Sequence, residues 1–468
     1  MARTACLTPL LLLSALVAGC SWGRFDDITE NAPIVLLNKP DELSNGFGTS
    51  MATGTYDDSN GKTNVALLVG GAPLQGGAVE FQLGTGDSPT LDALDRGHCM
   101  SDEGIPCYMS NSPVALNGAQ SPGMIRPLCF VDGAGTASVD TGVVVRCNDD
   151  VEYALDVPEN VDELLQFSIN RNQPTLFRFG ADHGYGTTLL ATADEERSVW
   201  FYPALDAKRR FLEIPYPDND RGRWPTVEDV ATSQPKYGRN LTVARVGDGR
   251  LMAVGIPDLS EVRLFFSPDG NAEPSYLGCL GGTARFGRSF ATGKVLAGDP
   301  DDALVIADES LVYVFSAAKL ATLLPTTETG CSLASLPPDA LISSFTCGST
   351  KGISGCAGSD FGAALAVGDL DGDGDGEVVV GAPRMTVRDI SGAGAVLIYD
   401  VEEPADADFI DVGFMSSAEK DDRLGTAIAL PDLGSRQIIA AGAAGNGKTA
   451  LFYCPSFLPG NLAGPRCN

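Results

Sequence analysis

The sequence is poor in histidine and in basic residues, and these shortages exclude several classes of function. Its 468 residues include two histidines, His98 and His183, and 32 lysines and arginines against 61 acidic residues. The formal charge of −29 repels phosphate backbones and anionic membrane surfaces, so we expect no nucleic-acid binding. Both histidines lie in glycine-rich or cysteine-rich turns, which does not favour a role in proton transfer. No CxxC pair is present, so a zinc site is not expected.

Long stretches with the periodicity of a helix are also hard to find. Glycine (55 residues) and proline (29) are plentiful, which favours short strands joined by turns. Apart from the run Leu7 to Val17, no apolar run approaches the length that spans a membrane, and that run is itself too short. The composition therefore predicts an all-β fold.

The first 19 residues are predicted to be a lipoprotein signal peptide. Arg3 supplies a positive charge, and the apolar run ends in small residues directly before Cys20. This ending resembles the bacterial lipobox, in which the chain is cut before the cysteine and the thiol is acylated; ordinary secretory cleavage nearby is the alternative. We expect an exported protein held in the bacterial cell envelope by lipid on Cys20, with residues 20–43 as a tether. Ser21 is compatible with the outer membrane, by resemblance only.

The remaining cysteines predict disulfides. Removing Cys6 with the signal peptide and acylating Cys20 leaves ten of the twelve cysteines, an even number that suits an oxidising compartment. The sequence does not determine the connectivity. Pairing of nearest neighbours would join Cys99 to Cys107, Cys129 to Cys147, Cys279 to Cys331, Cys347 to Cys356 and Cys454 to Cys467.

A repeated unit decides the predicted fold. Its clearest copy has Phe361-Gly362, a short strand, an acidic loop, an apolar strand ending in Gly381-Ala382-Pro383, and a β-branched strand ending at Tyr399. Such units cannot bury their faces alone, but stacked radially they bury one another, as the blades of a β-propeller do. Copies of the unit start at Phe47, Tyr185, Tyr237, Phe286, Phe361 and Leu424.

The spacing of the copies bears on the number of blades. The 138 residues from Phe47 to Tyr185 are far more than the 49 that separate Tyr237 from Phe286. We therefore expect one further blade within residues 84–183, together with a disulfide-stapled insertion. Residues 44–468 would then form a propeller of seven blades of about four antiparallel strands, although six or eight blades are compatible with the spacing.

Phe361-Gly362, Gly381-Ala382-Pro383 and the aspartate-rich loop between them resemble the FG-GAP repeat of integrin α-subunit propellers. The resemblance implies a seven-bladed propeller in which the FG and GAP segments tie blades together near the hub. Residues 20–43 could supply a strand that closes the ring. The family usually carries calcium in several consecutive blades, on the face opposite the partner-binding face, whereas this chain has one intact loop.

The intact loop runs from Asp369 to Glu377 and is predicted to bind calcium. Its carboxylates stand at loop positions 1, 3, 5, 7 and 9, and Gly374 permits a sharp turn. We expect Asp375 to coordinate through its backbone carbonyl and the other four through their side chains, namely Asp369, Asp371, Asp373 and Glu377. An EF-hand does not fit, because the strand Val378–Val380 follows directly. Residues 299–302 are acidic but out of register.

These features favour a binding, adhesion or protein-interaction module whose partner is an unidentified protein or glycan. A propeller enzyme acting on polysaccharide, as hydrolase or lyase, would need two converging carboxylates in a pocket at the hub. A structural component of an envelope complex would show a large apolar patch. The segment Gly445–Thr449 ends like a phosphate-binding loop, but its spacing differs and it joins two strands, so we predict a hairpin turn.

Overall fold

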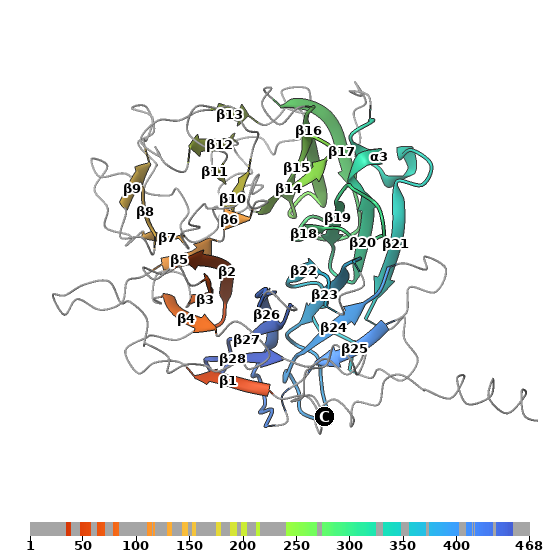
Figure 1. The fold of residues 1–468 in the computed structure, drawn as a ribbon. Helices are drawn as coiled ribbons and strands as arrows, with labels where there is room; N and C mark the ends of the chain where they lie inside the picture. Colours follow the sequence, from red (N-terminus) through yellow and green to blue (C-terminus); the bar gives the residue numbers. More distant parts are fainter. Residues whose placement is uncertain are drawn as a thin grey trace, which may run out of the picture.

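In the computed structural model, the described regular secondary structure is almost wholly β-strand, and the strands are arranged in a ring of sheets (Figure 1). The structure describes these residues: 34–38, 47–57, 63–70, 78–83, 240–268, 274–323, 331–347, 355–370, 374–401, 409–413, 415, 417–433 and 437–452, with strand backbones between 110 and 215.

The described strands form seven sheets, of which the first three lie in the N-terminal half of the chain. One has three strands: β2 (Ser50–Asp57), β3 (Thr63–Gly70) and β4 (Ala78–Leu83). The second has four: β5 (Ser110–Val114), β7 (Cys129–Asp132), β8 (Val143–Cys147) and β9 (Glu152–Leu155). The third has five: β6 (Leu116–Asn117), β10 (Thr175–Arg178), β11 (Thr188–Ala193), β12 (Ser198–Pro203) and β13 (Leu212–Pro215).

Three four-stranded antiparallel sheets follow in chain order. They are β14 (Asn240–Val246), β15 (Gly249–Ile256), β16 (Glu261–Ser267) and β17 (Ser275–Gly281); β18 (Ser289–Gly293), β19 (Ala303–Ala307), β20 (Leu311–Ser316) and β21 (Leu341–Thr346); and β22 (Leu365–Gly368), β23 (Glu377–Ala382), β24 (Ala395–Tyr399) and β25 (Phe409–Gly413). Two short helices, α3 (Ala317–Leu320) and the 3-10 turn η3 (Leu333–Ser335), separate β20 from β21.

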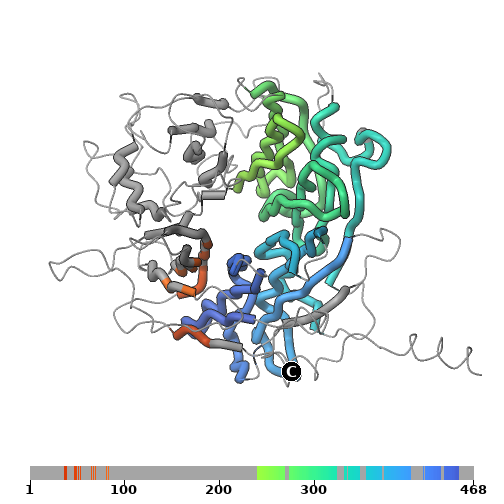
Figure 2. Tube along the Cα trace, in the orientation of Figure 1, coloured from red at the N-terminus to blue at the C-terminus, as the bar shows by residue number. Residues whose placement is uncertain are grey.

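The last sheet joins the two ends of the described chain. It contains β26 (Leu424–Ala429), β27 (Ile439–Ala443) and β28 (Lys448–Phe452), and β1 (Ile34–Asn38) pairs antiparallel with β28 as its outer strand. Figure 2 shows the red N-terminal strand beside the blue C-terminal ones. Strand β26 of this sheet contacts β2 on one side and β22 and β23 on the other. The all-β prediction with antiparallel sheets of about four strands is confirmed, while the number of blades stays a prediction.

The core lies between sheets rather than within one. β23 and β24 are buried along their whole length, which explains why both are almost entirely apolar. Residues of β19–β21 and β22–β24 share one cluster, in which the rings of Phe345 and Tyr399 stack with their centroids 4.3 Å apart. Among the sheets whose side chains the structure describes, apolar faces are therefore buried against neighbouring sheets.

Consecutive repeats meet through a recurring pair of glycines. A Cβ on Gly381, the glycine of the GAP segment, would lie 2.1 Å from the carbonyl oxygen of Gly425 in the next repeat. Gly255 approaches Gly287 in the same way, and Gly442 of the last sheet approaches Gly48 of the first copy. A side chain at these positions would push neighbouring sheets apart, so the glycines fix how closely the sheets pack.

Candidate functional site

The acidic loop connects β22 to β23. The structure describes Asp369 and Leu370 at its start and Gly374 to Glu377 at its end, whereas Asp371 and Asp373 lie outside the described residues. Glu377 and Gly368 are partners across the two strands, so the ends of the loop are held side by side. This places the first and last predicted calcium ligands at the base of one hairpin.

Two carboxylates accept hydrogen bonds from backbone amides at the base of the loop. Leu370 N donates to Glu377 Oε2 at 2.7 Å, and Gly374 N donates to Asp369 Oδ2 at 3.1 Å. Glu377 and Asp375 are only 3% and 4% exposed, and Leu370 is also buried. Gly374 adopts φ +101°, a conformation that glycine accepts without strain. The sequence prediction of a sharp turn at this glycine agrees with this geometry.

The described part of the loop offers some of what a calcium site requires. Its donors are carboxylate oxygens, the type of ligand that calcium takes, and two of the three carboxylates are buried. Among the residues that the structure describes, however, no three acidic, histidine or cysteine side chains cluster closely enough to hold a metal. The donor chemistry fits calcium, and the ligand set from Asp369 to Glu377 stays a prediction.

The neighbouring sheets hold this hairpin from both sides. A Cβ on Gly376 would lie 2.3 Å from the carbonyl oxygen of Lys294, which follows β18. On the other side, a Cβ on Gly368 would lie 2.0 Å from Oε1 of Gln437, just before β27. The hairpin is therefore in close contact with both neighbouring sheets, so a change in its conformation would displace residues of both.

The second acidic segment, residues 299–302, has a different role. Asp302 Oδ2 accepts a hydrogen bond from Arg245 N at 2.7 Å, and Asp301 Oδ1 accepts one from Gly247 N at 2.6 Å. Burial raises the pKa of the Asp302 carboxyl above its ordinary value of 3.8, against the opposing effect of the bond from Arg245. These carboxylates tie their sheet to the β14–β15 hairpin of the preceding sheet.

The hub contains a cavity of about 190 Å³ lined by residues at or just before β2, β14, β18, β22 and β26. The lining residues include no carboxylate. Three polar side chains of the lining donate to neighbouring backbone: Asn240 Nδ2 to Arg288 O at 2.5 Å, Ser289 Oγ to Gly362 O at 2.5 Å, and Thr426 Oγ1 to Arg423 O at 2.6 Å. Among the described residues that line this cavity, the paired carboxylates that a polysaccharide-cleaving site would need are therefore not found.

Arg288 links two consecutive repeats beside this cavity. Its side chain is 6% exposed, and Nη1 lies 2.5 Å from Asp360 Oδ1. Nη2 donates to the carbonyl oxygens of Asp360, at 3.2 Å, and of Phe361. The arginine that follows one FG dipeptide therefore holds the backbone of the next, a function that sequence reasoning missed because the partners lie 72 residues apart.

The segment from Gly445 to Thr449 is the turn between β27 and β28 and the start of β28. Asn446 Nδ2 donates to Asp422 Oδ1, and Lys448 Nζ lies 3.9 Å from Glu419 Oε1 and 4.0 Å from Asp422 Oδ1. Carboxylates thus bind the groups that would face a phosphate in a phosphate-binding loop. This arrangement agrees with the predicted hairpin turn.

Two disulfides join the described part of the chain. Cys279 in β17 bonds to Cys331, which precedes η3 in the next sheet, and Cys347 bonds to Cys356 in the connection that leads to Phe361. Both pairs are those expected from nearest neighbours. Cys129 and Cys147 are partners across β7 and β8, but their bond stays a prediction. The other candidate cysteines lie outside the described residues: Cys20, Cys99, Cys107, Cys454 and Cys467.

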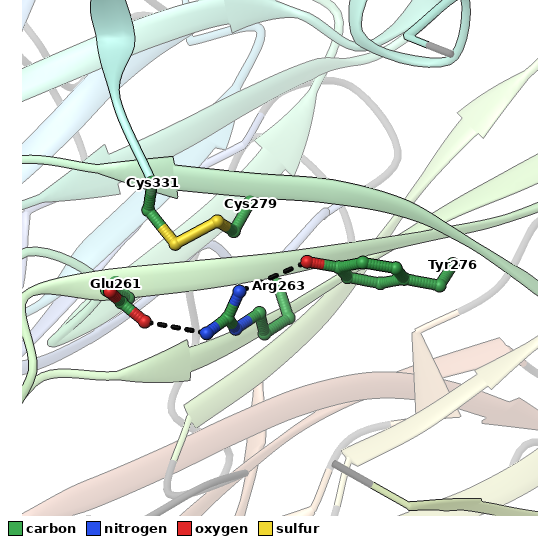
Figure 3. The surroundings of a disulfide bond; sticks show 5 residues. All are labelled: Glu261, Arg263, Tyr276, Cys279 and Cys331. Atoms are coloured by element: carbon green, nitrogen blue, oxygen red, sulfur yellow. Dashed lines mark hydrogen bonds and ion pairs between the residues drawn. A yellow bond between two sulfur atoms is a disulfide. The ribbon is translucent and has the colours of Figure 1, made fainter. Parts of the chain in front are cut away.

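A buried ion pair lies beside the first disulfide (Figure 3). Arg263, which is fully buried, lies opposite Cys279 in the sheet; its Nη2 is 2.8 Å from Glu261 Oε2, and its Nη1 donates to Tyr276 Oη at 3.1 Å. Sequence reasoning missed this pair. The signal was present, because Glu261 and Arg263 alternate with apolar residues and so lie on one face of β16.

Among the described residues, no helix is long and apolar enough to cross a membrane. The two disulfides and the FG-GAP-like repeat point to an extracellular domain.

Comparison with known proteins supports the repeat and the fold. Residues 361–399 match the family model described as FG-GAP repeat. No curated protein matches the chain. The crystal structure of BBS1N in complex with ARL6DN, soaked with mercury, is 11% identical with a TM-score of 0.50, over 90% of this chain and 98% of that chain. The same complex soaked with lead gives 11%, a TM-score of 0.49, and 90% and 97% coverage. BBS1N is a β-propeller, so the chain has a β-propeller fold and carries an FG-GAP repeat at residues 361–399.

Proposed function

We propose that this protein is a lipid-anchored, calcium-stabilised β-propeller of the cell envelope that serves as a protein-interaction module. The observation that carries the proposal is the FG-GAP repeat within a ring whose sheets are locked together by glycine contacts and by Arg288. A rigid ring of this kind holds its connecting loops in fixed positions, which suits recognition of a partner. The similar BBS1N structure was itself determined in complex with a protein, ARL6DN.

Calcium enters this proposal as a brace for one hairpin. Asp369, Asp371, Asp373 and Glu377 would bind it by side chain and Asp375 by backbone carbonyl. The ion would offset the repulsion among carboxylates packed into nine residues, two of which are already buried. Because the hairpin contacts both neighbouring sheets, the brace would also steady their spacing.

In this proposal, the lipid anchor determines where the protein is located. Lipid on Cys20 would hold the propeller at the membrane surface, with residues 20–33 as the spacer before β1. Mass spectrometry of the N-terminal peptide tests this point, because an unmodified N-terminus at another residue would contradict it.

Site-specific photo-crosslinking in intact cells tests the interaction role. A photoreactive residue would replace Ser391 in the β23–β24 connection or, as the matched control, Ala297 in the β18–β19 connection at the other end of the sheets; both residues are exposed. We expect a discrete protein adduct from one end of the propeller and not from the other. A lack of any discrete adduct, or turnover of a polysaccharide by the purified protein, would contradict the proposal.

A further inference from the structure

The two ends of the sheets carry different loops. Because consecutive strands are antiparallel, the loops that precede the first strand or join the second to the third lie at one end, which we call the FG face. Loops that join the first strand to the second or the third to the fourth lie at the other end, the acidic face. On the described C-terminal sheets the FG face comprises residues 257–260, 282–288, 308–310, 355–364, 383–394, 417–423 and 444–448, and the acidic face residues 247–248, 294–302, 317–323, 337–340, 369–370, 374–376, 400–401, 430–433 and 437–438.

Basic residues are concentrated on the FG face. The loops of the acidic face have two described basic residues, Lys294 and Lys319, against nine acidic ones. Two strand arginines, Arg245 and Arg250, also direct their guanidinium groups to carbonyl oxygens of these loops. The FG face has seven described basic residues against eight acidic ones. These seven are Arg285, Arg288, Arg384, Arg388, Lys420, Arg423 and Lys448. Over the described C-terminal loops, the FG face is therefore the end where an approaching protein meets less net negative charge.

Three of these arginines come from three consecutive sheets and present exposed guanidinium groups. They are Arg285, Arg384 and Arg423, and their guanidinium groups form no hydrogen bond or ion pair with the rest of the described chain. Their backbones, in contrast, are fixed. Arg285 N donates to Ser260 Oγ at 2.9 Å, Arg384 N to Ser359 O at 2.8 Å, and Arg423 N to Gly392 O at 2.9 Å.

Two of them occupy a conformation that arginine rarely adopts. Arg285 and Arg423 directly precede Phe286-Gly287 and Leu424-Gly425, with φ values of +63° and +61°. Asp360 holds the same place in the copy between them, at φ +59°, and there the carboxylate is bound by Arg288. Glycine would meet the conformational requirement with less strain. An arginine at such a position, whose guanidinium group has no hydrogen bond or ion pair with the described residues, points to a contact made with another molecule.

From these observations, we infer that the FG face docks an acidic segment of a partner protein, whose carboxylates pair with Arg285, Arg384 and Arg423. The inference rests on the proposed role as a protein-interaction module and specifies its surface and partner chemistry. The planar guanidinium group matches a carboxylate with two parallel hydrogen bonds, and such charge-assisted bonds are stronger than neutral ones. At physiological salt the Debye length is about 8 Å, which screens the charges of the acidic face from a partner on the FG face.

Fluorescence anisotropy with a short fluorescein-labelled peptide of alternating Glu and Gly tests the inference, with a Gln-Gly peptide as the probe control. The purified chain is used with calcium present, at low and at high salt. We expect saturable binding of the Glu-Gly peptide only, weakened about tenfold in the double variant Arg285→Gln/Arg423→Gln and further by Arg384→Gln. The matched variant Lys294→Gln/Lys319→Gln removes the same charge from the acidic face and should bind within about twofold of the parent.

Absence of saturable binding at low salt, or equal losses in the two double variants, would overturn the inference. Thermal denaturation of each variant shows whether it is folded. The crosslinking experiment separates the two proposals. A native partner that is crosslinked from the FG face and still binds the arginine double variant would support the interaction module and refute the role of the arginines. Peptide binding without any native adduct would support the role of the arginines and contradict the interaction module.

Discussion

Single side chains provide the links that hold one repeat to the next, and Arg288 shows how. Its guanidinium is nearly buried and binds one carboxylate and two carbonyl oxygens of the following repeat. Arg285, three residues earlier, is exposed and leaves its guanidinium without such a contact. The same residue type therefore has opposite roles at two neighbouring positions, set by burial and partners rather than by sequence.

Replacing Arg288 is expected to destabilise the fold strongly. Arg288→Ala would remove the donor to the Asp360 carboxylate and to the carbonyl oxygen of Phe361, and one of the two donors to the carbonyl oxygen of Asp360. We expect a loss of about 2–4 kcal/mol of unfolding free energy. Urea denaturation measures it. Arg285→Ala serves as the matched control and should cost less than about 0.5 kcal/mol, as is usual for exposed sites. Similar losses in both variants would contradict the role assigned to Arg288.

The buried carboxyl of Asp302 predicts a dependence of stability on pH. Since burial raises its pKa in the folded state above 3.8, the folded state binds a proton more readily than the unfolded state. This contribution to stability is present below pH 3.8 and is lost as the pH rises through the folded pKa. Asp302→Asn keeps an oxygen acceptor for Arg245 N and avoids the ionisation. The variant should therefore gain stability relative to the parent between acidic and neutral pH, as measured by urea denaturation; a constant difference would contradict the prediction.

At the scale of elements, the repeat of residues 361–399 was the part most open to prediction. Its strands are short apolar runs bounded by glycines, and β24 lies within the predicted segment. β23 begins one residue before its predicted strand, at Glu377, the last residue of the predicted loop. The role of residues 299–302 could not be inferred, because their partners, Arg245 and Gly247, lie more than 50 residues away and contribute backbone amides. Long-range contacts of this kind leave no local pattern in the sequence. An acidic segment that joins two sheets therefore cannot be distinguished, from the sequence alone, from a cation-binding loop that has lost some of its ligands.

Calcium binding is a property of the β22–β23 hairpin and can be tested there. We expect calorimetric titration of the metal-free protein with calcium to show a saturable heat that Asp371→Ala removes, because one side-chain ligand is lost. Asp248→Ala, in the exposed β14–β15 hairpin turn that occupies the equivalent place, is the control and should leave the heat unchanged. Chelation should lower the melting temperature of the parent and not that of Asp371→Ala. Equal heats from parent and Asp371→Ala would contradict the site.

The two disulfides staple different lengths of chain and should differ in their effect. Cys279–Cys331 closes a loop of 52 residues and joins two sheets, whereas Cys347–Cys356 closes nine residues within one connection. Chain entropy predicts a loss of about 4 kcal/mol when the first pair is replaced by alanine, and about 2.5 kcal/mol for the second. Urea denaturation of the two double variants measures both. A larger loss for the short loop would show that packing, and not chain entropy, dominates.

The whole molecule is a ring, and its stability depends on how the ring is closed. The described core clusters each span neighbouring sheets, so a gap between two such sheets would expose two apolar faces at once. Closure is achieved twice over: Gly442 of the last sheet packs on Gly48 of the first copy, and β1 pairs along the whole of β28. The uneven distribution of charge between the two faces of the described sheets is also a property of the whole molecule. The formal charge of −29 does not show it, because it depends on which loops the strands bring to each face.

Removing β1 tests closure directly. A chain that begins after Asn38 would lose the strand that covers β28, together with Leu37, which is 1% exposed in the cluster shared by the first and last sheets. The bared edge of β28 would then offer unpaired backbone groups to other molecules. We expect this truncation to lower the melting temperature and to form oligomers in size-exclusion chromatography. A chain that begins at Ile34 keeps β1 and is the matched control, which should stay monodisperse. If both truncations behaved alike, the ring would be closed by the glycine contact and the shared core, and β1 would be dispensable.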